Sequence, residues 1–125
     1  MKMPPLNMDE TIMLVDAYYS MRKTGNKATK ASFYKKLSAS LRGLPFYPKL
    51  KKNPQFRSES AVEIMMNNMF YTETMREGVW TRLTQKQEAV MSYYADDLDL
   101  LHDVSEAISA VSAFISKNQL KFPIV

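Results

Sequence analysis

The chain has no cysteine, a single histidine and only three glycines among its 125 residues. Without cysteine it can form neither a disulfide nor a thiolate metal site, and His102 alone cannot make a histidine-rich metal cluster. The few glycines fit neither the P-loop pattern nor the dinucleotide-binding pattern, which excludes the common phosphate-binding loops. These absences predict a protein that holds no metal and no cofactor.

Long apolar runs are also missing. The opening "MKMPPLNMDE" lacks the apolar segment of a secretory signal, and such a segment has roughly 7–15 residues. Nowhere does the chain approach the roughly 18 consecutive apolar residues that indicate a transmembrane helix. We therefore expect a cytoplasmic protein with no membrane partner.

Groups that could perform catalysis are scarce. The carboxylates cluster at Asp96, Asp97, Asp99, Asp103 and Glu106. The last three fall on one helical face near His102, where a metal site is one interpretation. The other is that acidic residues opening a helix complement its dipole and face solvent, and we favour it. With no nucleophile–base pair, the sequence predicts that the protein is not an enzyme.

Charge is divided unevenly along the chain. The formal net charge is +4, yet residues 22–57 hold eleven Lys or Arg and no Asp or Glu. The other residues hold six Lys or Arg and all thirteen acidic residues, and residues 84–118 form an acidic, helix-patterned part. Dense basic segments are typical of proteins that bind polyanions. Nucleic acid is the partner class that this pattern favours.

Hydrophobic periodicity predicts an all-α fold, a compact bundle of about five helices in one domain spanning residues 1–125. Asn7, Ser58 and Thr84 are expected N-caps, and Gly43 is expected to end the second helix. The predicted first, second, fourth and fifth helices cover residues 8–22, 30–42, 84–94 and 97–117. The third is predicted to begin at residue 59 and to continue until the pattern breaks at 74–80. A long basic loop separates the second and third helices, so this pair is only helix-turn-helix-like.

Two of these helices carry apolar faces. The third is expected to bury one face, made of Val62, Met65, Met66, Met69 and Phe70. The fifth has a seam that repeats by three and four residues, made of Leu101, Val104, Ile108, Val111 and Ile115. Either the first helix covers this seam or a second copy does, which would make a homodimer. The apolar ending "LKFPIV" is expected to dock on the core or on a partner.

Four stretches, in their order along the chain, resemble a domain found at the N-terminus of many bacterial HNH-type restriction endonucleases. They are "DETIMLVDAYY", "KLSASLRGLPFYP", "FRSESAVEIMMNNM" and "EAVMSYYADDLDLLHDVSEAI", and together they cover about residues 8–110. The second keeps the family pattern L-S-x-x-L-R-x-L-P-x-x-P. In the third, residues 58–61 replace the family's Asn-Pro-Asn-Gly turn, and Met65 replaces its lysine. The resemblance implies DNA recognition, with double-stranded DNA as the expected partner. No HNH nuclease follows in this chain, so it implies no cleavage.

The basic loop and its flanking helices are the candidate DNA-binding surface. Cations there would neutralise phosphates, the start of the third helix would offer amides to the backbone, and small polar residues would read bases. The candidate DNA-binding residues are Lys35, Lys36, Arg42, Lys49, Lys51, Lys52, Arg57, Ser58, Ser60, Glu63 and Asn67. The aromatic residues Tyr34, Phe46 and Tyr47 lie among the cations and either stack on bases or pack beneath the loop.

A second interpretation makes the chain a small phage or mobile-element protein that binds and inhibits a nucleic-acid-processing enzyme, of the anti-restriction or anti-CRISPR type. The acidic C-terminal part would then mimic DNA, or the basic third would occupy a nucleic-acid site. The apolar seam of the fifth helix favours this interpretation. The positive net charge argues against DNA mimicry alone.

Overall fold

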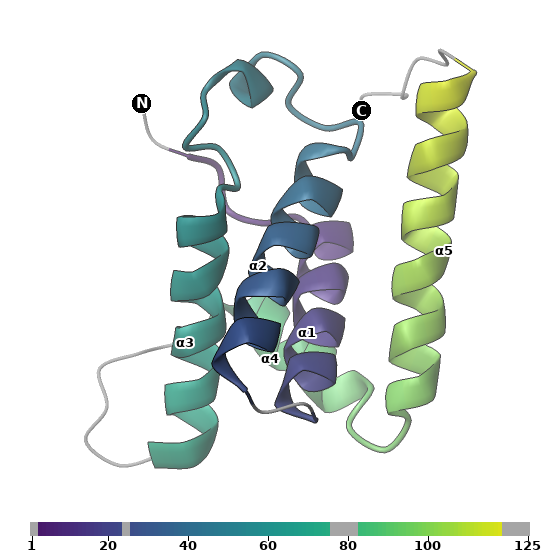
Figure 1. Ribbon diagram of the computed structural model, residues 1–125. Helices are drawn as coiled ribbons and strands as arrows, with labels where there is room; N and C mark the ends of the chain where they lie inside the picture. The colour runs from purple at the N-terminus through teal and green to yellow at the C-terminus, as the bar shows by residue number, and fades with distance from the viewer. Residues whose placement is uncertain (1–2, 24–25, 76–82, 119–125) are drawn as a thin grey trace.

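A computed structural model describes residues 3–23, 26–75 and 83–118, which form five α-helices and no strand (Figure 1). The helices are α1 (Met8–Arg22), α2 (Lys27–Arg42), α3 (Glu59–Met75), α4 (Gln85–Tyr93) and α5 (Leu98–Lys117), and a short 3-10 helix covers Leu50–Lys52. The predicted all-α bundle of about five helices is confirmed. The apolar ending from residue 120, and all but the first two residues of the pattern break at 74–80, lie outside the described residues. Within the described ranges, no helix combines the length and apolarity needed to cross a membrane.

Helix α1 is the centre of the bundle. It packs against each of the other four helices, and Leu14, Val15 and Tyr18 are completely buried. It begins with the capping box expected at Asn7, whose side chain accepts from the Glu10 amide at 2.8 Å while Glu10 Oε1 accepts from the Asn7 amide at 3.0 Å. A helix surrounded by others has no single apolar stripe, which is why Glu10 is buried too.

The predicted inner face of α3 is correct except at one position. Val62, Met66 and Met69 are fully buried in the core, and Met65 is half-buried against it. The prediction that Phe70 belongs to the core is wrong, because its side chain is exposed. It lies about 100° round the helix from Met69, on the outer side of α3, where the Lys30 ammonium lies 5.8 Å from its ring centre.

Helices α2 and α3 run antiparallel beside each other (Figure 1), and the loop of residues 43–58 joins them. The pair therefore resembles a helix-turn-helix only in the order of its elements. Helix α2 begins three residues before the predicted start because the Asn26 side chain accepts from the Thr29 amide at 2.8 Å. Gly43 follows its last residue, as predicted.

A buried hydroxyl links α1 to the far end of α3. The Tyr18 hydroxyl donates to Glu73 Oε1 at 2.5 Å, and Arg22 Nη1 donates to the same oxygen at 2.6 Å. Burial, and then the hydrogen bond to the Glu73 carboxylate, raise the pKa of Tyr18 above its ordinary value of 10.0. The neutral hydroxyl is therefore the form that the folded state favours.

This shift predicts how stability depends on alkaline pH. A folded-state pKa above the unfolded one contributes stability that is fully present below pH 10 and is lost as the pH rises through the folded-state pKa. We expect the free energy of unfolding, measured with urea between about pH 9 and 11, to fall less steeply in Tyr18→Phe than in the parent. Tyr93→Phe supplies the control, because it removes a tyrosine hydroxyl from a side chain that is exposed. Equal slopes for Tyr18→Phe and the parent would contradict the shift.

Candidate nucleic-acid interface

Most of the predicted DNA-binding residues lie on the loop of residues 43–58 or on the helix ends beside it. This loop closes the end of the bundle where α2 ends and α3 begins (Figure 1). Its conformation depends on two arginines from the basic segment, Arg42 and Arg57, whose contacts decide which cations remain exposed.

Arg57 is a buried structural residue. Its side chain is 6% exposed and that of its partner Glu10 is 1% exposed. The guanidinium donates from Nε to Glu10 Oε2 at 2.7 Å and from Nη2 to Glu10 Oε1 at 3.1 Å, and its Nη1 donates to the Pro4 carbonyl at 2.9 Å. The interpretation of Arg57 as a DNA contact is corrected here, because a guanidinium whose donors are bonded inside the fold cannot also reach a phosphate.

Arg42 stabilises the loop by hydrogen bonds to its backbone carbonyls. Its Nη1 donates to the Asn53 carbonyl at 3.2 Å, and the same guanidinium donates to the carbonyls of Phe56 and Lys51. A planar group with five donors suits such convergent carbonyls, whereas a lysine ammonium does not. Arg42 therefore binds the protein's own backbone, and its predicted role as a phosphate contact stays a prediction.

Lys51 also points inward. Its ammonium donates to the Leu44 carbonyl, and burial, followed by the nearby Arg42 charge, lowers the pKa of Lys51 from its ordinary value of 10.5. A half-buried lysine beside an arginine is disfavoured in its charged form. Like Arg42 and Arg57, Lys51 therefore uses its charged group for a hydrogen bond inside the protein, which helps to fix the conformation of the loop.

An aromatic layer completes the underside of the loop. Phe56 is buried, the Tyr47 ring meets it edge-on with centroids 6.0 Å apart, and the Arg57 guanidinium lies 4.7 Å from its ring centre. Tyr47 and Arg57 both adopt positive φ, 52° and 48°, a conformation that costs bulky residues about 1–2 kcal/mol. Such strain persists only where surrounding contacts enforce it. Of the two roles open to Tyr47, packing beneath the loop is the one observed.

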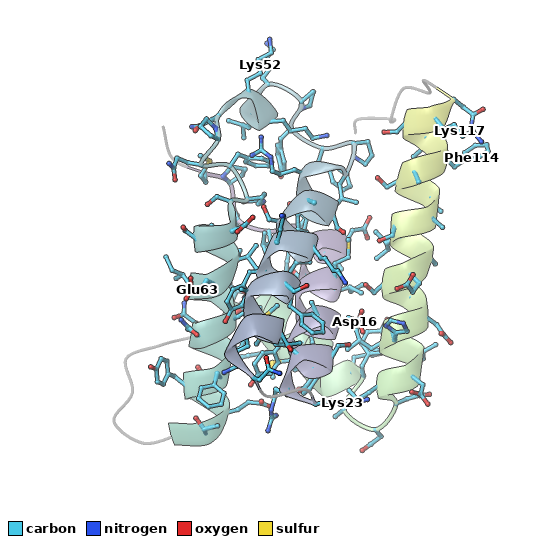
Figure 2. All side chains as sticks on the ribbon, viewed as in Figure 1. Asp16, Lys23, Lys52, Glu63, Phe114 and Lys117 are labelled. Carbon is cyan, nitrogen blue, oxygen red and sulfur yellow. The ribbon has the colours of Figure 1, made fainter. Side chains whose placement is uncertain are left out.

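Four of the predicted cations are exposed, in two places. Lys49 and Lys52, here called the loop-tip lysines, are exposed on the loop, and Lys52 extends away from the bundle at its end (Figure 2). Lys35 and Lys36 are exposed on α2. Lys35 precedes Arg42 by seven positions, a rise of about 10 Å along the helix. The structure thus separates the exposed cations into a loop group and a helix group.

The start of α3 presents polar side chains beside the loop. Ser58 is the predicted cap, and its Oγ accepts from the Ala61 amide at 3.2 Å. Ser60, Glu63 and Asn67 are all exposed and recur at i, i+3 and i+7, so they share one face. Glu63 points away from the bundle (Figure 2).

Two residues on that same face were not identified from the sequence. Ile64 is 60% exposed, and Tyr71, seven residues further along α3, is exposed as well. Apolar residues in a helix are expected to point inward, so only their spacing from Ser60, four and eleven residues, could have placed them outside. The outer face of α3 is therefore mixed, polar with two large apolar side chains.

The histidine contacts acidic groups on two helices. His102 Nδ1 lies 3.2 Å from both carboxylate oxygens of Asp16 on α1, and its Nε2 lies 3.6 Å from Glu106 on α5. In residues 3–23, 26–75 and 83–118, no group of three or more His, Cys, Asp or Glu is arranged to hold a metal ion. The contact joins α5 to α1.

No protein-family model, no curated protein and no solved structure matches the chain. The resemblance to the HNH endonuclease domain therefore stays a prediction that rests on its quoted motifs.

Proposed function

We propose that the protein is a non-catalytic DNA-binding module that contacts the phosphate backbone through the loop-tip lysines and the N-terminus of α3. The observation that carries the proposal is the internal pairing of the loop. Because Arg42, Lys51 and Arg57 bond to the protein's own carbonyls and to Glu10, the loop has a defined shape and Lys49 and Lys52 project from it.

Three further features support DNA as the partner. No acidic residue occurs in residues 22–57 to oppose a phosphate, so the exposed lysines act on an anion without nearby repulsion from that segment. The positive end of the α3 dipole lies beside the loop and favours an anion there. Ser60 and Asn67, on the exposed face of α3, are side chains that can hydrogen-bond to base edges.

The salt dependence of binding tests this proposal. Each phosphate neutralised in duplex DNA contributes about 0.9 to the slope of log affinity against log salt. We expect Lys49→Glu/Lys52→Glu to reduce that slope by about 2 and to weaken binding at least about tenfold at low salt, as measured by fluorescence anisotropy. Circular dichroism should show unchanged helicity, since both side chains are exposed.

A matched pair of single variants provides the control. Lys52 and Lys23 are both exposed and lie at opposite ends of the bundle (Figure 2), so Lys52→Glu and Lys23→Glu change the net charge equally. Lys52→Glu should weaken binding and Lys23→Glu should leave it near the parent value. Equal losses would mean that only net charge acts, and undetectable binding at low salt would reject the proposal.

The outer face of α3 favours a second candidate, a small phage or mobile-element protein that inhibits a nucleic-acid-processing enzyme. Ile64 and Tyr71 are large apolar side chains in an exposed position, and such groups are common at the centre of protein interfaces. This candidate predicts a complex with the enzyme that survives high salt and nuclease treatment and that Ile64→Glu abolishes. A complex that dissociates on nuclease treatment would instead favour DNA binding as the function.

A further inference from the structure

The apolar stripe of α5 is wider than the surface that covers it. Leu101, Ser105 and Ser112 are buried on α5, which packs against α1, and the Ser112 hydroxyl donates to the Gly43 carbonyl at 3.1 Å. On the other side of the stripe, Leu100 is 43% exposed, Val111 58% and Phe114 60%. The predicted seam from Leu101 to Ile115 is thus covered by α1 only in part, and within residues 3–23, 26–75 and 83–118 Val111 stays largely exposed.

The outer side of the stripe has a regular spacing. Leu100, Val104, Ala107, Val111 and Phe114 follow one another at intervals of four, three, four and three residues. Four of them are exposed, and Val104 is half-buried against the core. The intervals are those of the a and d positions of a coiled coil, with Val104 and Val111 at a and the other three at d. An outward-facing apolar seam of this spacing in a helix that already packs on its own domain marks a surface that a second helix of the same pattern can cover.

We propose that α5 pairs with α5 of a second copy of this chain, in an antiparallel coiled coil that forms a homodimer. The partner is a second copy because the same seam and its flanking charges are self-complementary when the helix is reversed. The interface is isologous, as a two-fold dimer requires.

The flanking charges select the antiparallel direction. Asp103 lies immediately before Val104, an a position, and Lys117 lies three residues after Phe114, a d position. Both therefore occupy the g position, on the same side of the seam. In the reversed register, Val104 faces Phe114 of the second copy and Ala107 faces Val111 of the second copy. That register brings Asp103 opposite the second copy's Lys117, twice by symmetry. In a parallel pair Asp103 would instead face apolar residues such as Ile108.

The side chains are positioned for this contact. Asp103 and Lys117 are exposed, and Phe114 and Lys117 point away from the bundle on the same side of α5 (Figure 2). Beside the seam, a groove of about 300 Å³ is lined by Val104, Val111, Leu44 and Phe46 among others. The groove extends the apolar surface that a second copy can cover.

The mass in solution tests the dimer. The chain is 14.4 kDa, and sedimentation equilibrium should give twice that mass. Phe114→Glu should raise the dimer dissociation constant by about a hundredfold or more, because it replaces the largest apolar side chain of the seam by a charge on both subunits. Ala113→Glu is the matched control: Ala113 is exposed on the opposite side of α5, and this variant should dimerise like the parent. A parent that is monomeric at all concentrations would overturn the proposal, and the face would then be covered by another segment or another partner.

Cysteine crosslinking tests the direction, since the chain has no cysteine of its own. Under oxidation, a mixture of Ala107→Cys and Val111→Cys chains should form a mixed disulfide, while neither variant alone should crosslink efficiently. A parallel pair would crosslink Val111→Cys to itself, and that result would overturn the antiparallel arrangement.

The charge pair is tested separately. Lys117→Glu should weaken the dimer about three- to tenfold, because it replaces two attractions by two repulsions at exposed positions. Asp103→Lys/Lys117→Glu should restore the parent affinity. If the double variant stays as weak as the single one, the proposed register is wrong.

Discussion

Replacing Glu10 by alanine is expected to lower the free energy of unfolding by about 3–5 kcal/mol, the usual cost of leaving one partner of a buried ion pair uncompensated. Glu10 and Arg57 are almost completely buried and make two hydrogen bonds to each other. Glu10 Oε1 also closes the capping box of α1, so the variant loses that cap as well. Urea denaturation at neutral pH measures the loss.

Two controls separate the buried pair from charge in general. Glu63→Ala removes an exposed acid and should change stability by less than about 0.5 kcal/mol. Glu10→Leu/Arg57→Met removes both charges and should be more stable than either single variant, because no charge is left buried alone. Added salt should alter the Glu10→Ala effect little, since buried pairs are weakly screened. A loss below about 1 kcal/mol for Glu10→Ala would contradict the buried pair.

Replacing Arg42 by methionine is expected to lower the free energy of unfolding by about 2–3 kcal/mol and to loosen the loop. Its guanidinium bonds to the carbonyls of Lys51, Asn53 and Phe56, and hydrogen bonds to charged groups contribute about 1.5–3 kcal/mol each. The total stays below their sum because Arg42 is only half-buried and water replaces part of what is lost. Arg42→Lys should recover little, since an ammonium cannot match the guanidinium geometry.

Hydrogen exchange locates the effect of Arg42. The amides of Asn53 and Phe56 bond to carbonyls within the loop at 2.9 and 3.0 Å, and their protection should fall in Arg42→Met. Lys52→Met is the control, because it removes an exposed cation from the same loop without an expected change in stability or exchange. If DNA binding occurs, Arg42→Met should weaken it through loss of loop shape and Lys52→Met through loss of a phosphate contact. Unchanged exchange in Arg42→Met would contradict a structural role.

Local signals in the sequence predicted the helices well. Asn7, Ser58 and Thr84 were expected to cap helices and do so, because a cap depends on a side chain and an amide three residues apart. The error at Phe70 also comes from a local signal, the hydrophobic periodicity of α3. The apolar pattern of α3 continues onto its outer face, and periodicity alone does not show where the covered face ends.

The candidate site was harder to predict because it depends on distant contacts. Along the chain, Arg57 and Lys52 are equivalent members of one acid-free basic segment. In the fold, Arg57 meets Glu10 from a position 47 residues away, while Lys52 stays exposed. No spacing rule connects residues so far apart, so the sequence could indicate the basic loop but not which of its cations point outward.

The sequence by itself determined the all-α class, the helix starts except that of α2, and the concentration of positive charge between residues 22 and 57, since these depend on neighbours within one or two helical turns. Only the tertiary structure decided how that charge is used. Packing α1 against every other helix buries Glu10, and a buried carboxylate requires a cationic partner, which is Arg57. The same packing covers one side of the α5 stripe and leaves Leu100, Val111 and Phe114 on the other side exposed.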